Sequence, residues 1–339
     1  MGVAPLRCLV KALHGVSAIS MRLPTFREVC MRREWTRRGV AAAALCALLM
    51  TLMPLPGALG HAAAATYQLV ENWAQLPPGT RWSQAISVDV DAHGTIYVSH
   101  WHYAMPIMAF DGNGRFLRTW GQGLFNTSHF LRTDPHGNIW VTDRGAHQIF
   151  KFSSEGTILM TLGQKGIRGD NESTDAFNKP ADVVIAKDGS IFITDGEEST
   201  SNRVVQYSKE GKFVKYWGGK GTEPGKFNDP HSIAMDSKGR LYVADRMNFR
   251  IQIFDQDGKY LDQWTHFGKP YGLFITRDDM LYVVDGSGND CLLIANTSDG
   301  KIVDRIGGLN NPNAVAVDKK GTIYIAENIG TNVKKFVKK

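Results

Sequence analysis

Two histidines and one arginine are the residues of this chain whose spacing first suggests chemistry. His231 opens the stretch HSIAMDSKGRLYVADR and Arg246 closes it, while His129 opens a similar stretch, HFLRTDPHGNIWVTDR. Imidazole groups bind zinc and move protons, and guanidinium groups bind carboxylates. Whether these side chains meet in space depends on the elements that carry them.

The two stretches belong to six copies of one unit. Each copy predicts two short strands around a tight turn, and most copies continue with a third and a fourth apolar strand. The aromatic residue of the second strand recurs every 40 to 52 residues, at Tyr97, Trp140, Phe192, Tyr242, Tyr282 and Tyr324. A repeat of this length is typical of propeller blades, and the absence of a helical period between strands excludes a TIM barrel.

The ends of the repeat array predict how the ring closes. The sixth copy ends at VKKFVKK without a fourth strand, whereas TYQLVENWAQ, from Thr66, is a strand without a unit. It resembles the fourth strand GKFVKYWGGK of another copy. We therefore predict an all-β, six-bladed β-propeller over residues 66–339, closed by an N-terminal strand that completes the last blade.

Residues 1–65 have the order of an export signal: arginines, an apolar run from Gly39 to about Leu55, then small residues. We expect cleavage near Ala65, with Met31 as the true start, and a mature protein in the periplasm or outside the cell. Arg37-Arg38 permits the twin-arginine route beside the Sec route. The apolar run is short for a span and ends in prolines, so no stable membrane anchor is expected after cleavage.

Charge and cysteine content narrow the partners of the mature chain. Residues 1–65 hold eight Lys/Arg and two Asp/Glu of the chain's 39 and 33, which leaves 31 of each sign. A neutral chain does not favour a nucleic-acid partner. Cys291 is the single cysteine after residue 65, so no intramolecular disulfide can form, and we expect a monomer with a small-molecule or peptide ligand.

Propeller geometry brings the starts of the first strands and the ends of the second strands to one mouth of the channel. The first set is Ile86, His129, Ala181, His231, Tyr271 and Asn313, and the second is His100, Asp143, Asp195, Asp245, Asp285 and Glu327. Because alternate blades are related by about a third of a turn, His129, His231 and Asn313 should converge on the axis. Three imidazoles would suit zinc with an open fourth position, but the third member here is an amide. Hydrogen-bonded lining of the channel is the alternative.

Other polar residues at this mouth have less specific predictions. The acidic set should cap amides of its own loops. Arg144 and Arg246 could each clamp a ligand carboxylate or pair with these acids. The segment from His100 through Trp101 and His102 to Tyr103 predicts an aromatic pocket wall, to which Tyr271 would add.

The repeats resemble NHL repeats, and several phrases are similar to the peptidyl-α-hydroxyglycine α-amidating lyase family. These phrases are DPHSIAMDSKGRLYVADRMNFRIQIFDQDG, KPADVVIAKDGSIFITDG and GNIWVTDRGAHQIFKF. The resemblance implies a six-bladed propeller with an axial zinc on three histidines and a nearby structural calcium. It also implies that a tyrosine and two arginines act on a hydroxyglycine substrate to release an amidated peptide and glyoxylate.

The resemblance assigns two zinc histidines to His129 and His231 and one arginine to Arg246. The third histidine falls on Asn313 and the acidic residue after it on Ala314. The tyrosine falls on Glu197, and the second arginine falls on Trp101. The differences from the family pattern lie at the positions of its metal ligands and catalytic residues. Loss of one imidazole ligand weakens zinc binding unless another ligand replaces it.

Three hypotheses follow. The leading one is an exported propeller that binds a small or peptidic ligand beside His129, His231 and Arg246, with the lyase chemistry lost or altered. The alternative is a metal-dependent lyase or hydrolase in which Glu197 or His102 completes the metal set or acts as the base. The third is a protein-interaction module that uses the broad faces of the ring.

Overall fold

The computed structural model describes residues 66–286 and 288–339. The predicted export signal, its cleavage near Ala65 and the start at Met31 lie outside the described residues, so they stay predictions. No helix in the described part of the chain has the length and apolar character needed to span a bilayer.

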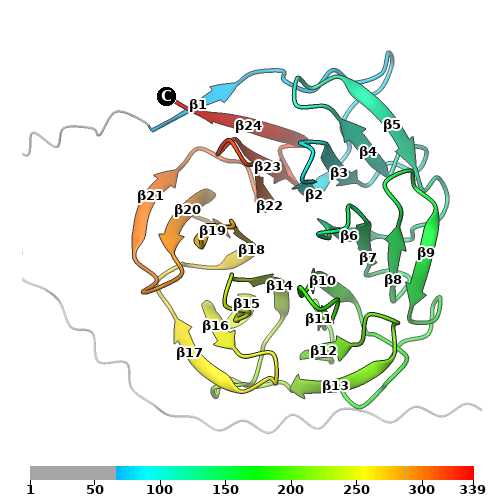
Figure 1. The fold of residues 1–339 in the computed structure, drawn as a ribbon, viewed down its shortest axis with the longest axis vertical. Coiled ribbons are helices and arrows are strands. Elements are labelled where there is room, and N and C mark those ends of the chain that lie inside the picture. Colours follow the sequence, from blue (N-terminus) through cyan, green and yellow to red (C-terminus); the bar gives the residue numbers. More distant parts are fainter. Residues whose placement is uncertain (1–65, 287) are drawn as a thin grey trace, which may run out of the picture. The chain divides into compact units, whose positions relative to one another are not determined.

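Six four-stranded antiparallel sheets surround a central axis (Figure 1), which confirms the predicted six-bladed propeller. Blade one holds β2 (Ala85–Val90), β3 (Ile96–His100), β4 (Ile107–Phe110) and β5 (Phe116–Trp120). Blade two holds β6 (Ser128–Thr133), β7 (Ile139–Asp143), β8 (Gln148–Phe152) and β9 (Ile158–Leu162). Blade three holds β10 (Pro180–Ile185), β11 (Ile191–Asp195), β12 (Arg203–Tyr207) and β13 (Phe213–Gly218).

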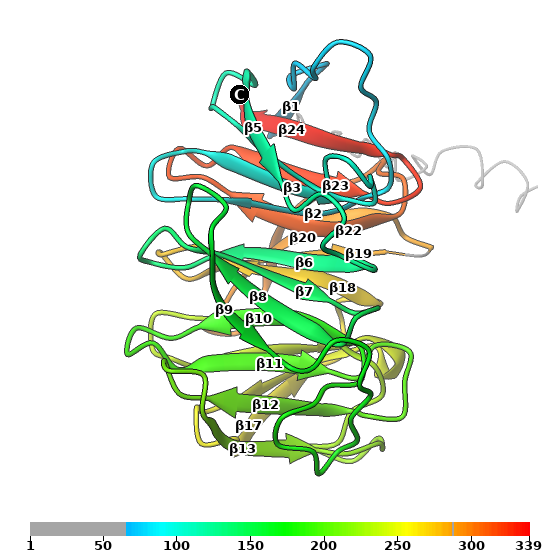
Figure 2. The same ribbon diagram turned by 90° about the vertical axis from the view of Figure 1, so that its right-hand side faces the viewer.

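The second half of the ring repeats this order. Blade four holds β14 (Pro230–Met235), β15 (Leu241–Asp245), β16 (Arg250–Phe254) and β17 (Tyr260–Trp264). Blade five holds β18 (Pro270–Ile275), β19 (Met280–Asp285), β20 (Cys291–Asn296) and β21 (Ile302–Ile306). Blade six holds β22 (Pro312–Val317), β23 (Ile323–Glu327), β24 (Asn332–Lys338) and β1 (Tyr67–Val70). Figure 2 shows the strands running from one face of the ring to the other.

The ring closes as predicted. Strand β1 pairs antiparallel with β24, from Tyr67 opposite Lys338 to Val70 opposite Lys335. Just after β1, the Trp73 indole is buried and donates Nε1–H to the Val333 carbonyl at 2.6 Å. The N-terminal segment therefore covers the outer edge strand of the last blade, and the Trp73 hydrogen bond holds the segment against that blade.

A β-bulge interrupts every innermost strand near its start. In each of the six blades the pairing of the first strand with the second shifts within the first four residues of the first strand. The residues left out of the register include the predicted mouth set, Ile86, His129, Ala181, His231, Tyr271 and Asn313. A bulge bends the strand and re-aims a side chain, so this repeated irregularity supplies the positions that surround the axis.

The second-strand ends hold the loops that precede the first strands, whereas the sequence predicted capping of their own loops, which Asp143 also provides through the amides of Gly145 and Ala146. The Asp143 carboxylate accepts the amides of Asn126 and Thr127 at 2.7 and 2.9 Å, and Asp245 accepts the amide of Asn228 at 2.7 Å. In blade one the imidazole of His100 takes this role, because its Nδ1 accepts the Ser83 amide at 3.2 Å.

The hydrophobic core lies between neighbouring blades. The aromatic side chains of the second strands are all buried there, with exposed fractions of 6% or less. Cys291 is buried in the cluster between blades four and five, as expected for a small apolar residue.

Candidate metal centre

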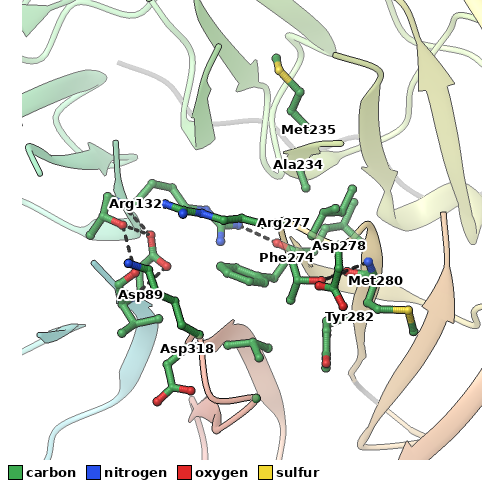
Figure 3. Close-up of a pocket in the computed structure, with 18 of the residues that line it drawn as sticks. Asp89, Arg132, Ala234, Met235, Phe274, Arg277, Asp278, Met280, Tyr282 and Asp318 are labelled. Carbon is green, nitrogen blue, oxygen red and sulfur yellow. Dashed lines mark hydrogen bonds between the residues drawn. The ribbon is translucent and has the colours of Figure 1, made fainter. Parts of the chain in front are cut away.

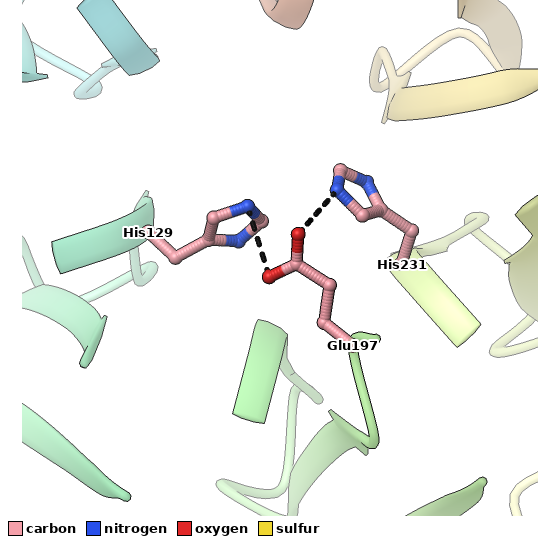
Figure 4. Close-up of side chains that lie close together, drawn as sticks. All are labelled: His129, Glu197 and His231. Carbon is pink, nitrogen blue, oxygen red and sulfur yellow. Dashed lines mark ion pairs between the residues drawn. The ribbon is translucent and has the colours of Figure 1, made fainter. Parts of the chain in front are cut away.

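Three buried side chains meet at the mouth formed by the bulges (Figure 4). His129 comes from β6, His231 from β14, and Glu197 from the loop between β11 and β12. Nε2 of His129 lies 3.3 Å from Oε2 of Glu197, and Nε2 of His231 lies 3.5 Å from Oε1. All three side chains have exposed fractions of 3% or less. Within residues 66–286 and 288–339 this is the only group of three or more His, Cys, Asp or Glu side chains arranged to share a metal.

Backbone carbonyls fix the tautomer of both imidazoles. Nδ1 of His129 lies 3.0 Å from the Ala181 carbonyl, and Nδ1 of His231 lies 2.8 Å from the Tyr271 carbonyl. A carbonyl oxygen only accepts hydrogen bonds, so each Nδ1 carries the proton and donates it. In the neutral ring the lone pair of each Nε2 then faces Glu197. Metal-bound histidines are held in this way, by a second hydrogen bond on the far ring nitrogen.

At neutral pH this group carries the negative charge of Glu197, and His129 contributes no positive charge to balance it. Burial lowers the pKa of His129 to about 4, although the Glu197 carboxylate partly opposes that shift. Burial also disfavours ionisation of Glu197, but His129, His231 and Arg144 outweigh it and hold the pKa of its carboxyl well below the usual range. Arg144 keeps the carboxylate ionised when His129 is neutral, so at neutral pH an anionic oxygen faces an imidazole lone pair, and two acceptors repel unless a cation lies between them.

The group fits a divalent metal by its chemistry and its spacing. Two imidazoles and one carboxylate form a known zinc-ligand set that leaves coordination positions open for water or substrate. Adjacent ligand atoms of a tetrahedral zinc ion lie roughly 3.3 Å apart, which is close to the separation of His129 Nε2 from Oε2 of Glu197. His231 approaches the other carboxylate oxygen, and one ligand atom from each of the three residues lies within 4.8 Å of the others. Oε2 of Glu197 and Nε2 of His231 are buried and make no hydrogen bond to any described residue.

A glycine lets Glu197 reach this position. Gly196 directly follows β11 and has a φ of 138°, and a Cβ on it would lie 1.8 Å from the Ser201 carbonyl oxygen. The amide of Glu197 donates to the Lys179 carbonyl at 3.1 Å. The loop therefore turns back under the mouth at the first residue after the strand, which directs the carboxylate to the axis.

Two arginines surround the carboxylate with different partners. Nη1 of Arg144 donates to Oε1 of Glu197 at 2.6 Å, and Nη2 donates to Glu198 at 3.1 Å. Arg246 is held by Asp229 through Nε at 2.9 Å and Nη2 at 2.5 Å. Its Nη1 lies 3.8 Å from Glu197 and makes no hydrogen bond to a described residue. Arg144 thus balances the charge of Glu197, whereas Arg246 keeps donors free for a ligand.

A cavity of about 460 Å³ lies beside these groups. It is lined by Arg246, Tyr271, Lys269, Lys220 and Met247, among others. The Arg246 guanidinium stacks over the Tyr271 ring at 4.8 Å, and the Lys269 ammonium lies 5.6 Å from the same ring. The lysines were not identified from the sequence, since they lie in the loops that precede β14 and β18 and carry no motif.

Asn313 lies at the mouth, and its side-chain nitrogen is turned toward the next blade. Its side chain is buried, and Nδ2 donates to the Ile86 carbonyl in blade one at 2.8 Å. Its assignment as a metal ligand stays a prediction, as does the structural calcium.

The aromatic segment after β3 also lies apart from the metal group. His100 and His102 stack on each other at 5.5 Å, and Nδ1 of His102 accepts the Met105 amide at 3.2 Å. Trp101 donates Nε1–H to the Ser128 carbonyl at 2.7 Å, while Tyr103 is 77% exposed. The structure therefore brings Glu197, and neither of these histidines, to His129 and His231. Ligand contacts by the segment stay predictions.

Comparison with known proteins places this geometry in a family. A family model described as NHL repeat matches residues 227–254. NHL repeat-containing protein 3 of Homo sapiens is 31% identical over 306 residues, which cover 80% of this chain and 84% of that protein. Peptidyl-alpha-hydroxyglycine alpha-amidating lyase 2 of Drosophila melanogaster is 27% identical over 321 residues, which cover 83% of this chain and 75% of that protein.

Longer enzymes and solved structures extend the comparison. Peptidylglycine alpha-amidating monooxygenase of Rattus norvegicus is 34% identical over 246 residues, and the match spans only 25% of that protein. A solved streptogramin B lyase structure has a TM-score of 0.60 at 16% identity, covering 80% of this chain and 98% of that one. That likeness concerns the fold alone. The sequence matches decide the family: this chain belongs to the NHL-repeat propellers related to NHL repeat-containing protein 3 and the peptidyl-α-hydroxyglycine α-amidating lyases.

Proposed function

We propose that this chain is a metal-dependent enzyme of the amidating-lyase type, acting on a small or peptidic substrate at the axial mouth. The observation that supports it is the approach of Nε2 of His129 to Oε2 of Glu197 at 3.3 Å, which places two acceptors face to face when His129 is neutral. A zinc ion shared by these atoms and His231 removes the conflict. Among the hypotheses raised by the sequence, this geometry favours the enzyme.

The chain's own residues would hold the ion and orient the substrate. His129, His231 and Glu197 are the ligands, and the carbonyls behind both rings keep their Nε2 atoms aimed at the axis. A bound zinc ion polarises a substrate oxygen and lowers the pKa of a bound water. Arg246, fixed by Asp229, directs its free Nη1 donors toward an anionic group of the substrate.

The reaction would differ from that of a three-histidine lyase. Glu197 stands where the resemblance places a tyrosine, and here the carboxylate would serve as a ligand. No phenol is then available at that position, so proton transfer falls to another group. These departures favour a second candidate, a propeller that binds the same class of ligand without turnover.

Metal content and glyoxylate release separate these possibilities. The full chain is purified without an affinity tag, its zinc is measured, and glyoxylate release from an α-hydroxyglycine peptide is followed with zinc supplied. We expect one zinc per chain in the wild type and in the exposed-site control His93→Ala, and loss of zinc in His129→Ala and Glu197→Gln. Zinc-dependent turnover supports the enzyme. Bound zinc without turnover of this or related peptides favours the binding candidate, and a chain that takes up no zinc overturns the metal site.

A further inference from the structure

A second cavity, of about 920 Å³, lies at the other ends of the innermost strands, away from the bulges. Figure 3 shows side chains that line it. The last residue of each innermost strand lines it, and these are Val90, Thr133, Ile185, Met235, Ile275 and Val317. Its volume is within the range of small-molecule sites, which combine apolar walls with a few converging polar groups. Five of the six strand-end residues are apolar, so the polar groups decide what the cavity can bind.

Arg132, one residue before the end of β6, supplies the first polar group. It is 8% exposed and reaches across the axis: Nε donates to Asp182 at 2.9 Å, and Nη2 donates to the Leu273 carbonyl at 3.0 Å. Nη1 makes no hydrogen bond to any described residue, and it is not sealed from solvent. Since Arg132 lines the cavity, this nitrogen keeps two N–H donors available there.

Asp89, at the matching position of β2, supplies the second polar group. It is 4% exposed, and its oxygens accept the Val90 amide at 2.9 Å and the Thr133 amide at 2.6 Å. No ion pair joins it to Arg132. Burial raises the pKa of Asp89, and the nearby charge of Arg132 offsets that shift only partly. Figure 3 shows both side chains on the same side of the cavity, with Phe274 near its centre.

Charge selects the head group of a ligand for this pair. Arg132 is already neutralised by Asp182, to which it donates two hydrogen bonds, so an ionised Asp89 leaves one net negative charge on this group. The rest of the lining does not offset that charge, because it holds five carboxylates (Asp91, Asp134, Asp278, Asp304 and Asp318) and four basic side chains (Arg277, Lys319, Lys320 and Lys338). A carboxylate would add a second negative charge in a buried place. An ammonium group could bind Asp89 but offers no acceptor to Nη1 of Arg132. A carboxamide offers a carbonyl to Nη1 and an N–H group to Asp89, without adding charge.

We propose that the cavity at the end of the innermost strands is a second ligand site, for a small apolar molecule that ends in a carboxamide. The carboxamide binds Arg132 and Asp89, and the apolar body contacts Phe274, Met235 and Val317. The site is independent of the metal centre, because no residue is shared between them.

The test compares three probes with one six-carbon chain: hexanamide, hexanoate and hexylamine. Binding to the full chain is measured by calorimetry and by changes in the NMR signals of Met235. We expect hexanamide to bind at least about tenfold more tightly than either charged probe, since each charged head leaves one polar group unpaired. Asp89→Asn removes the negative charge and should shift the preference toward hexanoate. Met235→Trp fills the cavity from a partly exposed position and should weaken hexanamide.

Controls keep the outcomes distinct. Each variant is compared with the wild type in thermal unfolding, and His129→Ala should bind hexanamide unchanged. The proposal is overturned if a stably folded wild type binds none of the probes or binds hexanoate as tightly as hexanamide. It is also overturned if His129→Ala abolishes binding while Met235→Trp does not.

Discussion

Asn313 donates its side-chain amide to the Ile86 carbonyl at 2.8 Å, and this bond repeats the one between His129 and the Ala181 carbonyl. In each case a side chain at the bulge reaches the bulge residue of the next blade, as His231 also does with Tyr271. The three bonds follow one another around alternate blades. Asn313 thus makes the same hydrogen bond to the next blade as the Nδ1–H of each histidine, but it has no second ring nitrogen to face the axis.

Asn313→His should therefore add a metal ligand. Its Nδ1–H can donate to the Ile86 carbonyl, which would aim Nε2 toward His129 and His231. We expect zinc affinity to rise at least about tenfold, as expected for one more imidazole ligand. Competition with a chelator of known affinity measures the change, and Asn310→His, in the exposed loop before β22, is the control. Equal affinities of the variant and the wild type would show that the axis cannot use a fourth protein ligand.

The metal-free protein should lose stability in acid because of His129. Its folded pKa is about 4, below the unfolded value of about 6.5, so the unfolded state binds more protons between these values. The free energy of unfolding should therefore fall as the pH is lowered from about 6.5 to 4, by up to about 3 kcal/mol. Urea unfolding of chelator-treated protein at several pH values measures the slope. His129→Gln should flatten it, and a variant with the same slope would assign the acid sensitivity to other groups.

Arg246 should contribute to substrate binding through its fixed geometry. In Arg246→Lys the ammonium cannot keep Asp229 and also present a planar pair of donors, so we expect the KM for an α-hydroxyglycine peptide to rise by about tenfold or more. Arg115→Lys, on the exposed surface, is the matched control. Steady-state kinetics, or the Kd if turnover is absent, provide the measurement. An unchanged constant for Arg246→Lys would remove this arginine from the ligand site.

Deletion of residues 66–73 should destabilise the whole propeller. It removes β1 and the buried Trp73, which also donates a hydrogen bond to β24. Burial of one large apolar side chain contributes about 1.5–3 kcal/mol, and exposure of the edge adds to the loss. We expect the Tm to fall by roughly 5 °C or more. Thermal unfolding with and without the segment tests this, and Glu71→Ala, an exposed change in the same segment, should leave the Tm unchanged.

Much of the fold could be predicted because it repeats. Six copies of one strand pattern gave the blade number, and the unpaired strand at Thr66 gave the closure by β1. The bulges could not be predicted, because register depends on pairing between strands, which the pattern of one strand does not encode.

The site was predicted less completely. His129 and His231 were placed at one mouth by the repeat, but the approach of Glu197 depends on the backbone turn at Gly196. Charge or residue type alone could not separate Glu197 from His102 as a third ligand. Residue type was also misleading for His100. Its imidazole suggests a ligand contact, but its Nδ1 accepts the Ser83 amide.

The bulges have a consequence for how such a ring can change over time. A bulge residue lies outside the regular ladder, so its side chain can be exchanged without breaking the pairing that holds the blade. The propeller thus presents six interchangeable addresses around one axis, and an imidazole, an amide or a phenol can occupy an address at little cost to the scaffold. Imidazoles occupy two of these addresses, at His129 and His231, and an amide occupies a third, at Asn313, so new chemistry could arise by a few substitutions on an unchanged frame.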